Sequence, residues 1–360
     1  MKLDVSYNVP LAPLTTLGVG GLAQHFVHLT DEQQLPLIAE YAKDAELDVC
    51  VLGGGSNVLV SDSVIERLVV KNELRGITAA ADGDTVLVTA AAGESWDSFV
   101  EDTVGRGLAG LENLSGIPGT VGAAPIQNIN AYGASAATTI DSVQVFDWKT
   151  SEFITVTAGE CAFGYRDSIF KQPAGASLIV AAVTFRLAPA GKADFTYRSA
   201  SQSIERYLAE KDIATPTIAD VREAVLNVRS NIGMLPGQFR SAGSFFKNTI
   251  VSTEVFESVQ RVVVKKFSEK DAAFSPWHWE LPDGQVKIST AFLMECSPYN
   301  KQTYGERRDA YVGLSPKHSL SIVTEEGATA ADVHSFVEKI VSAISDEFGI
   351  TIESEVNMID

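Results

Sequence analysis

The sequence is poor in the residues and runs that build disulfide scaffolds, metal sites and membrane spans. Its 360 residues include three cysteines, which are odd in number and far apart: Cys50, Cys161 and Cys296. This argues against a disulfide framework and for a reducing compartment, and no two cysteines have the spacing of a zinc site. No stretch approaches the ~20 apolar residues of a membrane span, and the first residues carry no apolar signal segment. We therefore expect a cytoplasmic protein that does not enter membranes.

Positive charge is also scarce. The chain has 28 lysines and arginines against 46 acidic residues, which gives a formal net charge of −18. Such a charge disfavours nucleic acid and anionic membranes as partners. An anionic small ligand would need local lysines, arginines or backbone N–H groups. The five histidines show no motif pairing, which disfavours both a serine nucleophile with a histidine base and a metal hydrolase.

The chain is long enough, and at 45% apolar enough, to bury more than one core. We expect an α+β fold of two or three domains, with a boundary near 189–192 and an irregular lead-in over 1–14. Helical periodicity and capping residues predict helices over 31–45, 96–106, 203–211, 217–232, 286–296 and 329–348. Short apolar runs predict strands over 49–52, 68–71, 85–92, 142–148, 153–157, 177–187, 320–324 and 351–356.

The segment 110–133 is the most informative part of the sequence. It contains five glycines among residues that are nearly all small or apolar, and Glu112 is its one charged residue. A solvated linker would be polar, and a helix would be interrupted by the glycines and prolines. We therefore expect buried, closely turning backbone that presents N–H groups to the phosphates and ring edges of a large nucleotide cofactor.

A second glycine run, over 53–57, follows the predicted strand 49–52. Consecutive glycines after a strand expose N–H groups that can cradle a pyrophosphate. The spacing matches neither the dinucleotide-binding fingerprint nor a P-loop, so a tight structural turn is the alternative interpretation. Together with the segment 110–133, however, this run offers two loops that could grip one extended dinucleotide.

Three further segments carry polar groups whose roles the residues alone leave open. Arg166 lies among aromatic residues and could hold a carboxylate through two parallel hydrogen bonds, or pair with Asp167. Ser244 could donate a proton, or serve as a turn residue. Glu353 and Glu355 fall on the same side of the last predicted strand, where two buried carboxylates would raise one pKa; a solvated edge strand is the alternative.

Taken together, these segments resemble one family, the UDP-N-acetylenolpyruvoylglucosamine reductases. The resemblance runs from about Pro13 to Val356, which is nearly the whole chain. It rests on motifs that are specific in combination, namely those at 16–18, 54–59, 92–94, 110–133, 163–170, 242–248 and 353–356. The stretches 110–133 and 163–170 match the family pattern almost completely.

The resemblance implies a two-lobed FAD-binding domain of the vanillyl-alcohol-oxidase (PCMH) type plus an α+β substrate-binding domain. The expected boundaries are a lead-in over 1–14, FAD lobes over 15–72 and 73–190, and a substrate domain over 191–360 whose C-terminal strand returns to the active site. The glycine segments contain no histidine that could tether a flavin, so we expect non-covalent FAD. Its expected contacts are Gly53, Gly54, Gly55, Ser56, Asn57, Gly116, Ile117, Pro118, Gly119, Gly122, Ala123, Asn128 and Gly133.

The resemblance also implies an activity. NADPH would reduce the FAD, and hydride would then pass to C3 of UDP-N-acetylglucosamine enolpyruvate, giving UDP-N-acetylmuramate for peptidoglycan precursor synthesis. Arg166 would hold the substrate carboxylate, Glu355 would share or donate a proton to it, and Ser244 would protonate C2. The matching substrate contacts are Tyr165, Tyr197, Lys247, Asn248 and Glu295, with Tyr197 on an extra loop that only one subtype of the family carries. The expected oligomeric state is a monomer.

The chain departs from the family pattern near the end of one predicted helix. A lysine usually follows Arg229, whereas this chain has Ile232 or Met234 at that place, and we expect Arg240 to supply the positive charge. Two milder departures replace a usual glycine and a usual proline, at Asn130 and Thr249. Two other functions compete with the reductase: an oxidase of the same flavin fold acting on a lactone, a 2-hydroxy acid or an alcohol, and a flavin- or nucleotide-binding protein without catalysis.

Overall fold

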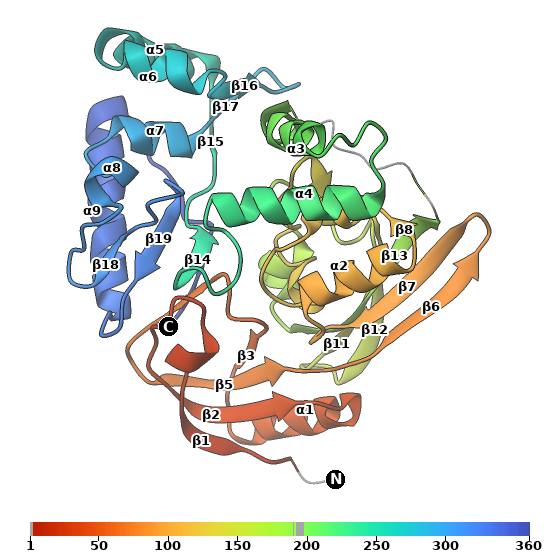
Figure 1. Ribbon diagram of the computed structural model, residues 1–360. Coiled ribbons are helices and arrows are strands. Elements are labelled where there is room, and N and C mark those ends of the chain that lie inside the picture. The colour runs from red at the N-terminus through yellow and green to blue at the C-terminus, as the bar shows by residue number, and fades with distance from the viewer. Residues whose placement is uncertain (1–2, 190, 192–197) are drawn as a thin grey trace. The chain divides into compact units, whose positions relative to one another are not determined.

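The computed structural model describes residues 3–189, 191 and 198–360 (Figure 1). The chain divides into two compact units, each assembled from segments far apart in the sequence. Unit 1 comprises Met1–Pro10, Leu22–Gly55 and Val64–Gln238, and unit 2 comprises Leu11–Gly21, Ser56–Ser63 and Phe239–Asp360. This division keeps residues up to Gln238 with the first unit, whereas the sequence led us to expect a boundary at 191.

A four-stranded sheet of order β1-β2-β5-β3 begins unit 1. Its strands are β1 (Ser6–Pro10), β2 (Leu22–Leu29), β3 (Val49–Leu52) and β5 (Ile65–Asn72). The last three run parallel, so β2 and β3 are joined by the short 3-10 turn η2 (Glu32–Gln34) and helix α1 (Leu35–Asp44). Helix α1 buries one apolar face against this sheet, through Leu35, Ile38, Ala39 and Ala42.

The second sheet of unit 1 is antiparallel, of order β12-β11-β13-β7-β6, with β8 also pairing β13. Its strands are β6 (Ile77–Asp82), β7 (Thr85–Ala91), β8 (Leu108–Ala109), β11 (Ile140–Asp147), β12 (Glu152–Thr157) and β13 (Leu178–Pro189). Helix α2 (Trp96–Gly105) packs on it, with the rings of Trp96 and Phe99 against Phe185. This aromatic core positions the glycine-rich segment between β8 and β11.

That glycine-rich segment is buried and closely turning, as its composition predicts. It contains the 3-10 turns η3 (Glu112–Leu114) and η4 (Val121–Ala123), followed by the short hairpin β9 (Asn130–Ala131) and β10 (Ala134–Ser135) and the turn η5 (Ala136–Thr138). Two further turns, η6 (Ile169–Lys171) and η7 (Pro173–Gly175), precede β13. Helices α3 (Arg198–Glu210) and α4 (Ile218–Asn231) complete unit 1 and share a small apolar core.

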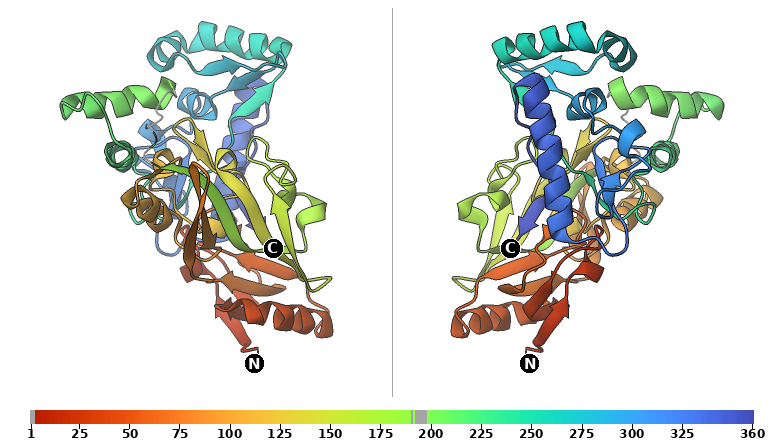
Figure 2. Two further views of the ribbon diagram at one scale, coloured as in Figure 1. Left: turned by 90° about the vertical axis from the view of Figure 1, so that its right-hand side faces the viewer. Right: turned by 90° about the vertical axis from the view of Figure 1, so that its left-hand side faces the viewer.

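Unit 2 contains three small sheets, of order β14-β19-β18, β15-β17-β16 and β20-β4. The strands are β4 (Val58–Val60), β14 (Ser241–Ser244), β15 (Thr249–Val251), β16 (His278–Glu280), β17 (Val286–Ile288), β18 (Val312–Leu314), β19 (Ser321–Thr324) and β20 (Asn357–Ile359). The helices are η1 (Ala12–Leu14), α5 (Thr253–Lys266), α6 (Ser268–Phe274), α7 (Thr290–Cys296), α8 (Lys301–Tyr304) and α9 (Ala330–Phe348). Figure 2 shows α9 as the longest helix of this unit, and its buried face joins the unit's core.

Helix α9 begins and ends where the sequence predicts. Thr329 and Asp332 form a reciprocal capping box, and Gly349 ends the helix with a left-handed φ of +69°. The Asp62 carboxylate adds a second cap, because its two oxygens accept the N–H groups of Ala330 and Ala331 at 2.8 and 2.9 Å. A carboxylate at a helix N-terminus also favours the helix dipole.

Three element predictions are wrong, and the third, the strand over 351–356, is described with the functional site below. The predicted helix 286–296 splits into strand β17 and helix α7, because Val286 and Ile288 are β-branched and buried, and Ser289 accepts the Phe292 N–H as an N-cap. The lead-in is not irregular throughout, since β1 pairs antiparallel with β2. Within the described residues, no helix is both long enough and apolar enough to cross a membrane.

The core of unit 2 yields a stability prediction. Phe336 of α9 is 1% exposed and its ring contacts those of Tyr299 and Tyr304. We expect Phe336→Ala to lower the free energy of unfolding by about 3–5 kcal/mol, because it removes a buried ring and leaves a cavity. Urea denaturation followed by circular dichroism measures this. Val264→Ala, at a site 59% exposed, is the control and should stay within about 0.5 kcal/mol of wild type; equal losses in both variants would contradict the assignment of this core.

Candidate functional site

Two glycine turns of unit 1 lie in direct backbone contact. One follows β3 and the other follows η3. A Cβ added to Gly54 would lie 2.7 Å from the Cα of Gly119, and one added to Gly53 would lie 2.8 Å from the Oγ1 of Thr120. Contacts this short between a Cβ and backbone atoms do not occur in real proteins. The two loops therefore approach each other only because neither Gly53 nor Gly54 carries a side chain.

These turns also offer hydrogen-bond donors to a ligand. Among the residues that the structure describes, no protein acceptor receives the N–H groups of Gly53, Gly54, Ile117 and Gly119. The Lys71 ammonium group contacts the Gly53 carbonyl, and burial lowers the pKa of that lysine. Clustered N–H groups beside a lysine suit the phosphates of a dinucleotide. The residues present therefore fit the FAD that the sequence predicts.

The remaining predicted flavin contacts lie in or next to these turns. Gly122 admits no side chain, because a Cβ there would lie 2.5 Å from the Cβ of Ala92. The side chain of Asn128 accepts from Ser135 Oγ at 2.7 Å and donates to the Gly164 carbonyl at 3.1 Å. Asn128 thus fastens the glycine-rich segment to the turn that follows Gly164. Gly55, Pro118, Ala123 and Gly133 belong to unit 1, whereas Ser56 and Asn57 belong to unit 2.

Arg166 lies at the tip of a tight turn in unit 1. The Gly164 N–H donates to the Asp167 carbonyl at 2.9 Å, so Tyr165 and Arg166 occupy the two central positions. Arg166 has a φ of +53°, and its carbonyl accepts a hydrogen bond from the Lys171 ammonium at 3.1 Å. The Asp167 carboxylate accepts hydrogen bonds from the Ser168 N–H and the Gln172 side-chain amide.

In unit 2, the segments of Ser244 and Glu355 lie side by side. The Glu355 N–H donates to the Phe245 carbonyl at 2.8 Å, and the Lys247 N–H donates to the Glu353 carbonyl at 3.0 Å. Ser244 itself pairs with Ser321 between β14 and β19. Two predicted catalytic residues, separated by more than a hundred residues of sequence, therefore stand on neighbouring strands of backbone.

The strand predicted over 351–356 is not a regular strand in the structure. Its two glutamates therefore lie in environments that differ from those expected. An isolated bridge joins Phe246 to Ser354, and regular pairing begins only at β20. Glu353 is exposed and its carboxylate lies 3.3 Å from the Lys247 ammonium, whereas Glu355 is 8% exposed. The two carboxylates do not share one buried face. The backbone of Glu355 is further held by Asn57, whose side-chain amide donates to the Glu355 carbonyl at 3.2 Å.

The predicted substrate contacts in unit 2 are held by well-defined partners. The side-chain oxygen of Asn248 accepts the Thr290 N–H at 3.2 Å, at the start of α7. The carboxylate of Glu295, at the end of the same helix, accepts from Ser319 and lies 3.7 Å from the Lys301 ammonium. Of the other predicted positions, Tyr197 lies outside the described residues, and the Arg240 guanidinium donates to the Gly18 carbonyl at 2.9 Å.

Four charged residues of unit 1 at the glycine turns were not found by the sequence reasoning. Lys71 contacts the Gly53 carbonyl, Asp97 and Arg229 bind Gly116, and Arg222 binds Asp97. The two arginines are less than a tenth exposed, whereas Lys71 and Asp97 are half-buried. A buried arginine in an amphipathic helix looks like an exposed one in the sequence, so periodicity alone could not find them.

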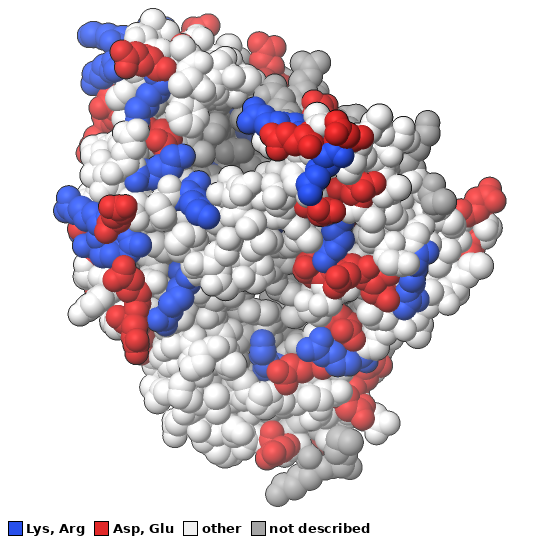
Figure 3. All heavy atoms as spheres, viewed as in Figure 1, with Lys and Arg blue, Asp and Glu red and all other residues white. Residues whose placement is uncertain are grey.

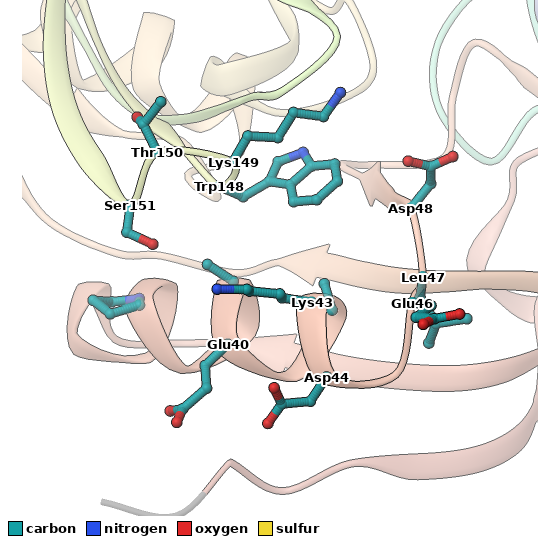
Figure 4. A pocket seen from close by; sticks show the side chains of 13 residues that line it. Glu40, Lys43, Asp44, Glu46, Leu47, Asp48, Trp148, Lys149, Thr150 and Ser151 are labelled. Carbon is teal, nitrogen blue, oxygen red and sulfur yellow. The ribbon is translucent and has the colours of Figure 1, made fainter.

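Unit 1 also has a surface cavity of about 770 Å³, which none of the site residues described above lines (Figure 4). Figure 4 shows Lys43 of α1 and Trp148 of the β11–β12 turn on opposite sides of the hollow. Its lining residues fall within 36–48 and 148–151, and none is a predicted site residue. Charge does not mark a site either: on the face drawn in Figure 3, the described lysines and arginines lie interspersed with acidic side chains.

Two family models match the chain. The FAD binding domain model matches residues 23–157, which includes both glycine turns. The model for the C-terminal domain of UDP-N-acetylenolpyruvoylglucosamine reductase matches residues 235–359, which includes Ser244 and Glu355. The predicted fold class, an FAD-binding domain of the vanillyl-alcohol-oxidase type followed by an α+β domain, is confirmed.

Full-length relatives and a solved structure agree with these models. The chain is 35% identical over 359 residues to UDP-N-acetylenolpyruvoylglucosamine reductase of Pseudomonas aeruginosa, covering 99% of this chain and all of that one. The same enzyme of Thermobifida fusca is 36% identical over 364 residues, covering 100% and 99%. The crystal structure of that reductase from Thermus caldophilus aligns over the whole of both chains with a TM-score of 0.63 at 24% identity, a likeness of fold. This chain therefore belongs to the UDP-N-acetylenolpyruvoylglucosamine reductase family, and it is an oxidoreductase.

Proposed function

We propose that this chain reduces the enolpyruvyl group of UDP-N-acetylglucosamine enolpyruvate to UDP-N-acetylmuramate, with NADPH as hydride donor and non-covalent FAD. The step would serve peptidoglycan precursor synthesis in the cytoplasm. The observation that carries the flavin part is the contact between Gly54 and Gly119, with open N–H groups on both turns. The substrate follows from relatives of that name over 99% of this chain.

In this proposal the two glycine turns hold the FAD through its pyrophosphate. The N–H groups of Gly54, Ile117 and Gly119 would donate to phosphate oxygens, and Lys71 would supply nearby positive charge. The glycines matter because only bare backbone lets the two turns approach closely. The chemistry that the flavin supplies when bound is acceptance of hydride from NADPH and its delivery to C3 of the substrate.

Arg166 is the proposed partner of the substrate carboxylate. A guanidinium can bind a carboxylate through two parallel hydrogen bonds, and its charge stabilises the negative charge that develops there when hydride adds to C3. The tight turn between Gly164 and Asp167 fixes the backbone of this arginine. The neighbouring Tyr165, 41% exposed, is the proposed contact for the rest of the substrate.

Ser244 and Glu355 are the proposed proton carriers. The Ser244 hydroxyl would deliver a proton to C2, which completes addition of two hydrogens across the enolpyruvyl double bond. Glu355 is buried, at 8% exposed, and is the proposed group that shares or donates a proton to the substrate carboxylate. The backbone of Glu355 is held in place, because its N–H donates to the Phe245 carbonyl and its carbonyl accepts from the side-chain amide of Asn57.

The remaining proposed contacts concern the anionic sugar nucleotide. Lys247 and Asn248 follow Ser244 along the same segment, and Tyr197 is the proposed contact of the extra loop. Glu295 would act from the end of α7, where Ser319 and Lys301 already hold its carboxylate. Arg240 is the proposed substitute for the lysine that the family usually carries near Ile232.

The function is tested by anaerobic stopped-flow absorbance on the purified protein. NADPH should bleach the bound flavin, and UDP-N-acetylglucosamine enolpyruvate should then restore its colour. Absence of any bound flavin would overturn the cofactor assignment. A flavin that NADPH bleaches but the enolpyruvyl sugar does not reoxidise would overturn the substrate, and oxygen uptake with simple hydroxy compounds would point to an oxidase.

Replacing Ser244 by alanine separates the proton step from flavin reduction. We expect the sugar-dependent reoxidation rate to fall about 10²–10⁴-fold, because one positioned proton donor is lost, while the rate of bleaching by NADPH stays unchanged. The same stopped-flow experiment measures both rates. Ser342→Ala, on α9 of the same unit, is the matched control and should behave as wild type. Reoxidation of Ser244→Ala at the wild-type rate would show that another group protonates C2.

The glycine contact gives a test that needs no substrate. We expect Gly54→Ala to weaken FAD binding by about tenfold or more, because its Cβ would force the Gly119 backbone to move. Flavin retained after gel filtration, measured by absorbance, reports this. Gly159→Ala is the matched control, since nothing lies within 4 Å of a Cβ there and it belongs to the same unit. Full retention of FAD by Gly54→Ala would contradict the proposed role of this contact.

A further inference from the structure

The backbone N–H and the backbone carbonyl of Gly116 are both hydrogen-bonded to charged side chains of unit 1. The Gly116 N–H donates to Asp97 Oδ1 at 2.6 Å, and the Gly116 carbonyl accepts from Arg229 Nε at 3.0 Å. Asp97 in turn accepts two hydrogen bonds from Arg222, at 2.6 and 3.1 Å. The glycine at the start of the second turn is therefore bound on both sides by side chains from α2 and α4.

The two arginines come from one face of α4. Arg222 and Arg229 are seven residues apart, which is two helical turns, so both project from the same side of the helix. They are 8% and 7% exposed, respectively. Burying a guanidinium is costly unless its donors are satisfied, and here Asp97, Gly116 and the Met234 carbonyl satisfy them. A helix that only needed to pack would not require two buried charges.

The ionisation of Asp97 supports a fixed charge at this place. Burial is the largest influence and by itself would raise the pKa of Asp97, but the hydrogen bonds from Arg222 and Gly116 outweigh it, so the pKa is lowered. The carboxylate therefore stays charged and its acceptor oxygens stay available to Gly116. Arg222 offsets that negative charge next to a turn that, by the proposed function, receives phosphates.

The backbone conformation of Gly116 affects the orientation of the N–H groups that follow it in the turn. Gly116 has a φ of +70°, and a Cβ there would lie 2.8 Å from Leu235 and 2.9 Å from Leu226, so only glycine fits. Ile117 is restricted because it precedes a proline, and Pro118 has a fixed φ. The orientation of the Gly116 peptide consequently determines where the Ile117 and Gly119 N–H groups point.

We propose that Asp97, Arg222 and Arg229 form a clamp that sets the orientation of the Gly116 turn for binding the FAD pyrophosphate. They are positioning residues, and Gly116 is the anchor of the turn rather than a phosphate donor, because its own N–H and carbonyl are already bound by protein. The inference rests on the proposed function, since it takes the ligand of this turn to be FAD.

The test measures the Kd of FAD for the flavin-free protein by quenching of flavin fluorescence. We expect Arg222→Met to weaken binding about 10- to 100-fold, because it leaves the half-buried Asp97 carboxylate without its arginine partner beside the phosphate site. Arg206→Met is the matched control, because Arg206 is an exposed arginine on α3 of the same unit. It should bind FAD as wild type does.

Charge rescue distinguishes the clamp from a merely structural role. Adding Asp97→Asn to Arg222→Met removes the unpaired charge while keeping an oxygen for the Gly116 N–H, so the double variant should recover much of the lost FAD affinity. A second variant, Arg229→Lys, keeps the charge but loses the Nε donor, and we expect it too to weaken binding. Arg229→Lys replaces Arg222→Met in the test if Arg222→Met does not fold, as judged by circular dichroism of the flavin-free protein.

The possible outcomes distinguish a failure of the proposed function from a failure of the clamp alone. Wild-type protein that binds no FAD overturns the proposed function itself. Wild-type binding together with unchanged Kd values in Arg222→Met and Arg229→Lys overturns the clamp alone. Weaker binding with no recovery in the double variant would also overturn it, because the loss would then not arise from the unpaired carboxylate.

Discussion

The organisation of unit 1 depends on the close approach of two stretches of bare backbone. Gly54 follows strand β3 and Gly119 lies between η3 and η4, and their contact requires that Gly54 has no side chain. Around it the chain holds each turn by other atoms: Lys71 contacts the Gly53 carbonyl, and Asp97 and Arg229 hold Gly116. The glycines provide the space, and the charged residues remove the freedom that glycine backbone would otherwise keep.

Unit 2 positions the proposed proton carriers Ser244 and Glu355 in a different way. Buried aromatic residues and backbone pairing hold the segments in place there. Phe245 and Phe246 are at most 1% exposed, and the Phe245 carbonyl accepts the Glu355 N–H. Ser244 immediately precedes this pair. Backbone pairing therefore fixes the two segments that carry Ser244 and Glu355, the proposed proton carriers.

The sequence predicts those parts of the fold that rest on local patterns. Helix α9 was found from its apolar stripe, its capping box and Gly349, because all three act within a few residues of one another. The nature of the segment 110–133 followed from its composition. The strand β17 was missed because Val286–Ile288 is stabilised by pairing with two other strands, which no short window of sequence contains. The clamp was missed for the same reason, since Asp97 and Arg222 are 125 residues apart.

The scarcity of positive charge in the chain bears on the role of the two buried arginines, Arg222 and Arg229. A chain with a net charge of −18 repels an anionic cofactor at long range, so binding has to come from short-range donors. Exposed lysines and arginines would contribute little, because water and salt screen them. Arg229 instead binds the Gly116 carbonyl and Arg222 acts through Asp97, and both arginines are largely buried. In the proposed clamp the ligand then meets neutral N–H groups whose direction is already fixed. In the proposed clamp, the positive charge of these two arginines orients a backbone turn and does not contact the anion itself.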